Sequence, residues 1–206
     1  MNARARNAIL VFSSLFIVLS TVAMLFYHGG YPGNIKAPRY IPQINFLSDL
    51  GLWHSYNNAT QPVSNVLFLL ALIAASAGIR IFFSVFLNPI RPGYRLGNTM
   101  SILASILTIV LGVLPQDVFY WPHRIVALLI FITMSLAFLA LSRQVSRRRV
   151  ALIGIFIAIY VLYAAFGPSP DISMPFREAQ AIFQKVTIYV TFLFIIYLTV
   201  TSPNHA

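Results

Sequence analysis

Apolar residues are grouped into six long runs along the chain, and short polar segments separate these runs. The pattern predicts helices at about 8–27, 62–87, 97–114, 123–142, 150–167 and 177–200. Each run has about the length that an α-helix needs to cross a hydrocarbon layer of roughly 30 Å. Proline and glycine, which break helices, stand in most of the separating segments. The pattern therefore predicts an all-α fold, a polytopic bundle of six transmembrane helices.

The composition strengthens the prediction of a membrane protein. Hydrophobic residues make up 59% of the chain and charged residues 9%, whereas soluble domains carry about 25% charged residues. The six runs leave no room for a separate soluble domain, so we expect one integral membrane domain over residues 1–206. The formal net charge is +10, but arginine-rich loops explain it without a nucleic acid partner. The absence of cysteine excludes disulfides and thiolate chemistry.

The distribution of basic residues predicts an orientation in the cell membrane. Cytoplasmic loops of membrane proteins collect arginine and lysine. With six spans, nine basic residues fall on the side of the two termini and four on the other side. Both termini are therefore predicted to be cytoplasmic, with the long loop 28–61 on the outer side. The nine are Arg4, Arg6, Arg80, Arg91, Arg95, Arg143, Arg147, Arg148 and Arg149, and the four are Lys36, Arg39, Arg124 and Arg177.

The acidic residues predict a polar pocket at the outer side. All four of them, including Asp171, fall on that side, together with three of the four histidines. Asp117 ends the third run and His123 opens the fourth, so we expect them to share a site with Asp49 and His54 of the long loop. The catalytic candidates are Asp117, His123, Asp49 and His54. Three of these, His54, His123 and Asp117, are candidates to bind a divalent metal ion.

The metal hypothesis has a simpler alternative. No helical pair of histidines with zinc-site spacing occurs in the chain. A lone histidine near a membrane interface is more often hydrogen-bonded to its surroundings, and an aspartate before a turn more often caps backbone N–H groups. Asp117 under this alternative has only a capping role.

Four further residues are candidates to bind a ligand at the outer side: Ser48, Asn65, Glu178 and Lys185. An ionisable residue inside a membrane span is a functional candidate. We expect Lys185 to have a buried partner, with Glu178 or a loop aspartate as first choice. The alternative is that its ammonium group extends outward along its aliphatic stem. Asn58 begins the glycosylation sequon NAT in the same outer region.

Four segments resemble the prokaryotic domain-of-unknown-function-998 membrane proteins: NFLSDLG, PVSNVLFLLALI, LGVLPQDVFYWPHRIVALLIF and EAQAIFQKVTIYVTFLF. The shared features are a Ser-(Asp/Glu)-Leu-Gly loop, an Asn heading the second span, a Gly-x-x-Pro-x-Asp end to the third, and a His opening the fourth. The chain is also similar to the DRAM/Sfk-type six-helix membrane proteins in its outer loop. The resemblance implies a six-helix bundle without an established activity, and it singles out Ser48, Asp49, Gly51, Asn65, Pro115, Asp117 and His123.

The segment QPVSNVLF is also similar to part of the alkaline-ceramidase-like membrane hydrolases. Those proteins use a Ser-x-x-x-His and a late His-x-x-x-His to bind zinc, and both motifs are missing here. The missing motifs argue against a hydrolase activity of that type. From the acidic residues and histidines of the outer side, we expect a membrane protein whose outward-facing Asp/His pocket binds or processes lipid or a small polar ligand. The alternative is a non-enzymatic structural or accessory subunit of a larger membrane complex. Membrane lipids are the expected partners, and a divalent metal ion is the candidate cofactor.

Overall fold

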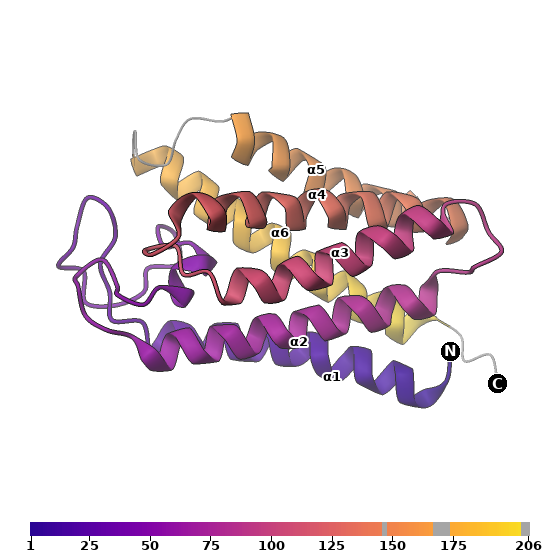
Figure 1. Ribbon diagram of the computed structural model, residues 1–206, viewed down its shortest axis with the longest axis horizontal. Coiled ribbons are helices and arrows are strands. Elements are labelled where there is room, and N and C mark those ends of the chain that lie inside the picture. The colour runs from indigo at the N-terminus through magenta and orange to yellow at the C-terminus, as the bar shows by residue number, and fades with distance from the viewer. Residues whose placement is uncertain (146–147, 167–173, 203–206) are drawn as a thin grey trace.

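The computed structural model describes residues 1–145, 148–166 and 174–202, and this part of the chain is helical with irregular connections. The six helices predicted from the apolar runs are confirmed (Figure 1). The largest difference is at the first helix, which begins five residues early because the Asn2 side chain accepts a hydrogen bond from Ala5 N at 2.7 Å. The elements are α1 (Ala3–Leu25), the 3-10 helix η1 (Leu47–Gly51), α2 (Pro62–Phe86), α3 (Tyr94–Gly112), α4 (Tyr120–Val145), α5 (Arg148–Phe166) and α6 (Met174–Thr201).

Length and hydropathy identify the molecule as a multi-pass membrane protein. Five helices, α1, α2, α3, α4 and α6, are long and apolar enough to cross a bilayer, and residues 149–164 of α5 form a shorter apolar helix. Large apolar side chains stay exposed on the outer faces, among them Val18, Ile106 and Leu152. Apolar side chains on the outer face are unfavourable in water but stable in contact with the lipid hydrocarbon.

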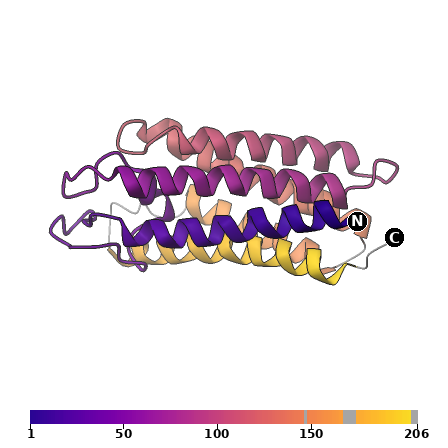
Figure 2. The same ribbon diagram turned by 90° about the horizontal axis from the view of Figure 1, so that it is seen from below.

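The six helices form a closed ring in chain order. Each helix from α1 to α5 packs on the next one, and α6 packs back on α1. Figure 2 shows α1 lying between α2 and α6. The N-terminus, the end of α6 and the connection 87–93 lie at one end, which we call the terminal end. The connections 26–61 and 113–119 lie at the opposite end, which we call the loop-rich end.

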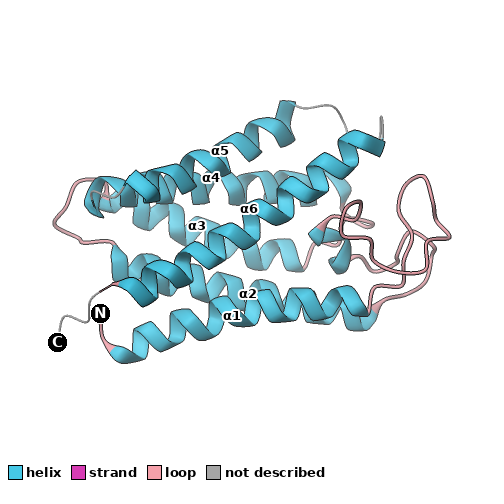
Figure 3. Ribbon diagram, turned by 180° about the vertical axis from the view of Figure 1, so that it is seen from behind, coloured by secondary structure: helices cyan, strands magenta, loops and turns pink. Residues whose placement is uncertain are grey.

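Helix α6 runs obliquely across the others, and this leaves a place for the long loop (Figure 3). Near the loop-rich end α6 contacts α5, where Phe183 packs against Tyr160 with ring centroids 5.5 Å apart. Further along, α6 contacts α1, where Phe192 packs against Phe16 with centroids 4.3 Å apart. Because α6 and α1 diverge toward the loop-rich end, η1 fits there and contacts α1, α2 and α6.

Small residues bring neighbouring helices close together elsewhere in the ring. Ser76 of α2 donates a hydrogen bond from Oγ to Ser105 O of α3 at 2.9 Å. Ser135 of α4 donates in the same way to Gly154 O of α5 at 2.8 Å. A Cβ atom at Gly154 would lie 3.1 Å from Ser135 O, so glycine permits this approach. Such contacts stabilise helix pairs where burial from water cannot.

Candidate functional site

The loop 26–61 folds into a compact unit around one buried amide. Asn45 is fully buried, and its Nδ2 donates to Gly30 O at 3.0 Å and to Asp49 Oδ2 at 3.1 Å. Its Oδ1 accepts a hydrogen bond from Ile41 N at 3.0 Å. Gly29 turns the chain at φ +95°, and a Cβ atom there would lie 2.0 Å from Ala37 O. Asn45 therefore ties the start of the loop, at Gly30, to its middle, at Ile41 and Asp49.

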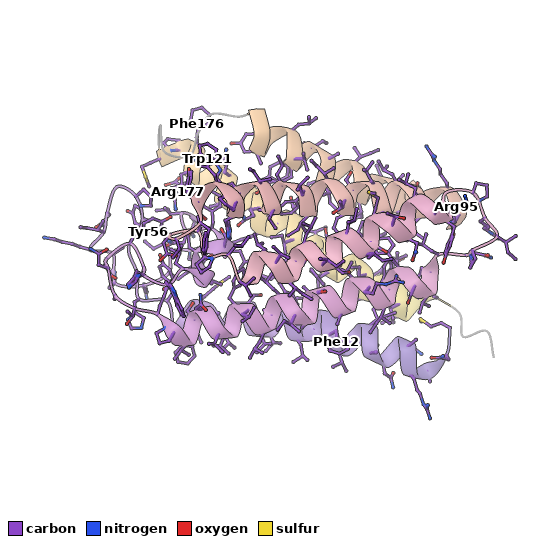
Figure 4. The ribbon with its side chains drawn as sticks, in the orientation of Figure 1. Phe12, Tyr56, Arg95, Trp121, Phe176 and Arg177 are labelled. Carbon is purple, nitrogen blue, oxygen red and sulfur yellow. The ribbon has the colours of Figure 1, made fainter. Side chains whose placement is uncertain are left out.

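A buried ion pair joins this loop to α6. The Asp49 carboxylate in η1 is fully buried and lies 3.4 Å from Nη2 of Arg177, which is 3% exposed. Arg177 also donates to the Tyr56 hydroxyl at 3.3 Å, and Figure 4 shows these two residues near each other at the loop-rich end. Burial raises the pKa of the Asp49 carboxyl above its ordinary value, while the Arg177 charge and hydrogen bonds from Asn45 and Phe46 N oppose that rise.

Two more side chains of α6 hold the loop through its backbone. Gln184 accepts a hydrogen bond at Oε1 from Leu47 N at 2.8 Å. Lys185 is buried and donates from Nζ to the carbonyl oxygens of Asn45 and Ala181. The expected buried partner of Lys185 thus exists, but it is the loop backbone, while Glu178 is exposed. Arg177, Gln184 and Lys185 of α6 therefore hold η1 and the loop around it, and we call these three residues the docking strip.

The start of α2 holds η1 from the other side. Gln61 is fully buried and donates from Nε2 to Asp49 O at 3.1 Å and to Leu52 O at 3.0 Å. Asn65 donates to Gly51 O at 2.6 Å, and Ser64 donates to Leu50 O at 3.1 Å. The last three carbonyl groups of η1, those of Asp49, Leu50 and Gly51, thus each accept a hydrogen bond from a side chain at the start of α2.

Asp117 binds the backbone of the long loop. Its Oδ1 accepts from Trp53 N at 3.1 Å, and its Oδ2 accepts from His54 N at 2.9 Å. The His54 ring nitrogen Nδ1 also lies 3.6 Å from Asp117 Oδ2, with the His54 side chain 56% exposed. Of the expected site residues, Asp117 and His54 are therefore brought together, and the N–H groups that Asp117 binds belong to the long loop and not to its own turn.

His123 lies in the first turn of α4 and is 3% exposed. Its Nδ1 lies 2.6 Å from Leu114 O, across the turn that connects α3 and α4. Its other ring nitrogen, Nε2, is buried and has no hydrogen-bond partner in the part of the chain that the structure describes. His123 therefore ties the turn with one nitrogen and leaves the other available.

The predicted convergence into one Asp/His pocket is only partly met. Asp49 belongs to the cluster with Arg177, whereas Asp117 binds His54 and the adjacent backbone. Within residues 1–145, 148–166 and 174–202, no three His, Asp or Glu side chains form a group that could hold a metal ion. The structure therefore gives no support to a metal site at His54, His123 and Asp117. Asp171 lies outside the described residues.

The roles predicted for the ligand-binding candidates stay predictions. Three of them make contacts within the protein: Asn65 and Lys185 bind the loop backbone, and Ser48 Oγ donates to Gln116 Oε1 at 3.4 Å. Glu178 and the sequon residue Asn58 are exposed at the surface. Among the described residues, the four ligand-binding candidates therefore do not form a common cluster at the surface of the loop-rich end.

Sequence reasoning missed Arg177, Asn45 and Gln61 as buried residues. Charge counting places Arg177 among the outer basic residues, although it stands eight residues before Lys185 and thus shares its helical face. That spacing was a usable signal for a second buried cation. Asn45 and Gln61 carried no such signal, because their burial depends on how a loop without regular structure folds back.

A cavity of about 90 Å³ lies inside the helix ring below η1. All six helices contribute to its wall, which is mostly apolar and includes Phe68 of α2, Met134 of α4 and Phe192 of α6. Leu47 and Ser48 of η1, with Gln184 of α6, line the end that faces the loop. The polar cap and the apolar cavity thus share η1 as their boundary.

Comparison with known proteins gives a family but no activity. No curated protein and no solved structure matches the chain. A family model described as "Protein of unknown function (DUF998)" matches residues 20–201. The match includes the loop with η1, the start of α2, the turn from α3 to α4 and the docking strip of α6. The chain therefore belongs to the DUF998 family of proteins of unknown function.

Proposed function

We propose that this protein binds a membrane lipid and holds part of its hydrocarbon chain inside the helix ring. The observation that carries the proposal is the apolar cavity of about 90 Å³ to which every helix contributes. Apolar cavities lined by Leu, Ile and Phe stay dry and take up small apolar molecules. The volume is below the roughly 300–1,000 Å³ of pockets for larger ligands, so a segment of a chain fits, and the remainder extends between the helices.

The closed loop-rich end supports entry from the bilayer. η1 covers the cavity there, and the buried Asp49–Arg177 pair and the Gln184–Leu47 hydrogen bond hold η1 in place. Opening this end would separate the pair, and either charge left buried without its counter-ion is strongly destabilising. A lipid therefore enters sideways, between helices, from the medium that already surrounds the ring.

The proposal includes six spans with both termini in the cytoplasm. The 19 residues of α5 give a length of about 28 Å at 1.5 Å per residue, close to the hydrocarbon thickness of roughly 30 Å. α5 also packs between α4 and α6 in the ring. The terminal end carries Arg4, Arg91 and Arg95, and a concentration of arginine favours the cytoplasmic side.

A non-enzymatic accessory role in a larger membrane complex is the second candidate. It is favoured by the way the polar residues of the loop-rich end are used. Asp49, Asp117 and Lys185 bond to groups of the same chain rather than to an open pocket. In that role the loop would be a rigid surface for a partner, and the cavity would be a packing gap of the ring.

The test uses a variant that fills the cavity. Ala127 lines it from α4, and Ala127→Phe places a ring in the space that a hydrocarbon chain would take. Protein purified in mild detergent is analysed by native mass spectrometry for retained lipid, with helicity checked by circular dichroism. We expect wild type to retain lipid and Ala127→Phe to lose it while remaining folded.

A matched control separates internal lipid from lipid on the outer surface. Leu129 lies on the same helix, is 40% exposed and does not line the cavity, so Leu129→Phe adds bulk outside the ring. This variant should retain lipid as wild type does. If Ala127→Phe fails to fold, Ala75→Leu on the α2 wall of the cavity gives a smaller filling. Equal retention by wild type and a folded filling variant would overturn the proposal and favour the accessory role.

A further inference from the structure

We infer that His123 forms the polar end of the cavity and accepts a hydrogen bond from a hydroxyl or amide group of the bound lipid. The inference rests on the proposed function and narrows its ligand class. The ligand would be a neutral amphipathic lipid with a hydrogen-bond donor next to its chain, such as a long-chain alcohol or an acylglycerol. Hydrocarbons lack the donor, and ethers and esters offer only acceptors.

The contact with Leu114 O determines which nitrogen of the His123 ring carries the proton. Nδ1 lies 2.6 Å from Leu114 O, and a carbonyl oxygen can only accept, so Nδ1 carries the hydrogen. In a neutral imidazole the other nitrogen, Nε2, is then an acceptor. His123 forms no ion pair among the described residues, and the carboxylate of Asp117 is occupied by His54 and Trp53 N. A buried imidazolium without a counter-ion is costly, which favours the neutral ring.

The acceptor at Nε2 is unused by the protein. It is buried and has no hydrogen-bond partner within the described residues, whereas the great majority of buried polar atoms have one. Two polar groups that line the loop-facing end of the cavity bond within the chain: Gln184 Oε1 accepts from Leu47 N, and Ser48 Oγ donates to Gln116. His123 Nε2 is therefore one of the buried acceptors that remain for a ligand, together with Gln61 Oε1 and Thr187 Oγ1.

Helical spacing puts His123 in line with the cavity wall. The α4 residues that line the cavity are Ala127, Ile130, Phe131 and Met134, at intervals that define one face of a helix. His123 stands four residues before Ala127 on that face. The step is about 6 Å toward the loop-rich end. A chain lying along the wall of α4 would thus bring its head group to the level of His123.

The inference is tested with two probes that differ in one hydrogen-bond donor. Dodecanol and its methyl ether have the same chain, but only the alcohol can donate to Nε2. Affinities are measured in detergent-purified protein by displacement of radiolabelled dodecanol. We expect wild type to bind the alcohol about tenfold more tightly than the ether, the effect of one buried hydrogen bond.

Two variants separate the two ring nitrogens. His123→Asn places a donor near the position of Nδ1, so it keeps the tie to Leu114 O but removes the acceptor. It should keep its helicity and bind alcohol and ether equally. His123→Gln places an acceptor near the position of Nε2 and should retain part of the preference. Opposite behaviour of the two variants would show that the Leu114 contact, not the acceptor, matters.

The outcomes distinguish this inference from the proposed function. If wild type binds alcohol and ether equally, the cavity still binds hydrocarbon but His123 does not select a donor, and the inference is overturned. Tighter binding of dodecanoate than of dodecanol, lost in His123→Asn, would show a charged imidazolium and overturn it as well. If neither dodecanol nor its ether binds, both the inference and the proposed function are contradicted.

Discussion

Arg177 and Asp49 show how a single acidic residue is accommodated in a largely apolar protein. The Asp49 carboxylate has no exposed surface, and it receives hydrogen bonds from Asn45 Nδ2 and Phe46 N besides the Arg177 contact. A buried ion pair adds little net stability by itself, but removing one partner leaves an uncompensated charge. The pair therefore fixes where the loop docks more than how stable the bundle is.

Arg177→Met should lower the free energy of unfolding by about 3–5 kcal/mol, because Asp49 then remains buried without its cation. Thermal unfolding in detergent, followed by circular dichroism, measures the loss. Arg124→Met is the matched control: Arg124 contacts the Tyr120 hydroxyl on a partly exposed surface and should cost less than about 1 kcal/mol. Equal effects of the two substitutions would contradict a specific role for the buried pair.

The loss in Arg177→Met should depend on pH. Burial already raises the pKa of Asp49, and the charge of Arg177 opposes that rise, so its removal raises the pKa further. A carboxyl with a raised pKa contributes stability below its unfolded pKa of about 3.9 and loses that contribution as pH rises through its folded pKa. The difference in unfolding temperature from wild type should therefore grow as the pH rises above the folded-state pKa of Asp49 in the wild-type protein. A difference that shrinks over this range would contradict the assignment.

Lys185→Met should be much milder, with a loss of about 1 kcal/mol or less. Lys185 bonds to carbonyl groups, and Asn45 O keeps a second donor, the Tyr40 hydroxyl at 3.1 Å. Methionine also fills the same space without a buried charge. The same unfolding assay measures it beside Arg177→Met. A loss as large as that of Arg177→Met would show that Lys185 neutralises Asp49 directly.

At the scale of elements, the helices could be predicted and the loop could not. Each apolar run marks a helix because a span must satisfy its backbone internally, and Pro62 fixes the start of α2 to the residue. The fold of residues 26–61 depends on side chains such as Asn45 and Gln61, whose partners are distant carbonyl groups. No local periodicity records such contacts, so the fold of this loop could not be predicted.

Gln61→Leu should loosen η1, because the Leu52 carbonyl group that follows it loses its side-chain donor and the Asp49 carbonyl group keeps only Leu52 N–H. We expect a loss of about 1–3 kcal/mol and faster trypsin cleavage after Lys36 and Arg39, which are exposed in the same loop. Gln43 is exposed, so Gln43→Leu should leave the cleavage rate unchanged. Unchanged cleavage in Gln61→Leu would mean that α2 does not hold the loop.

At the scale of the whole molecule, the closed ring explains why the predicted site divided. Asp117 and His123 were expected beside Asp49 and His54 because all of them fall at one end. In the ring, however, η1 with Asp49 faces α6, while the turn 113–119 lies at α3 and α4. The sequence shows at which end of the bundle a residue lies, but it does not show where around the helix ring that residue is placed.

The proposed orientation is tested by single cysteines, since the chain has none of its own. Ile90 is 93% exposed at the terminal end, and Ile35 is 59% exposed in the long loop. In intact cells, Ile35→Cys should react with a membrane-impermeant thiol reagent and Ile90→Cys should react only after permeabilisation. The reverse pattern would place the termini outside and contradict the orientation.

The central claim, that a hydrocarbon chain lies inside the ring, is tested most directly by photo-crosslinking. A monoacylglycerol with a diazirine near its chain end is incorporated into membranes that contain the protein, and labelled residues are mapped by mass spectrometry. Lipid around any membrane protein labels outward residues such as Leu129. The account predicts additional labelling of Met134 and Ile188, which line the cavity, and its loss in Ala127→Phe. Labelling confined to outward residues in the wild-type protein would contradict it.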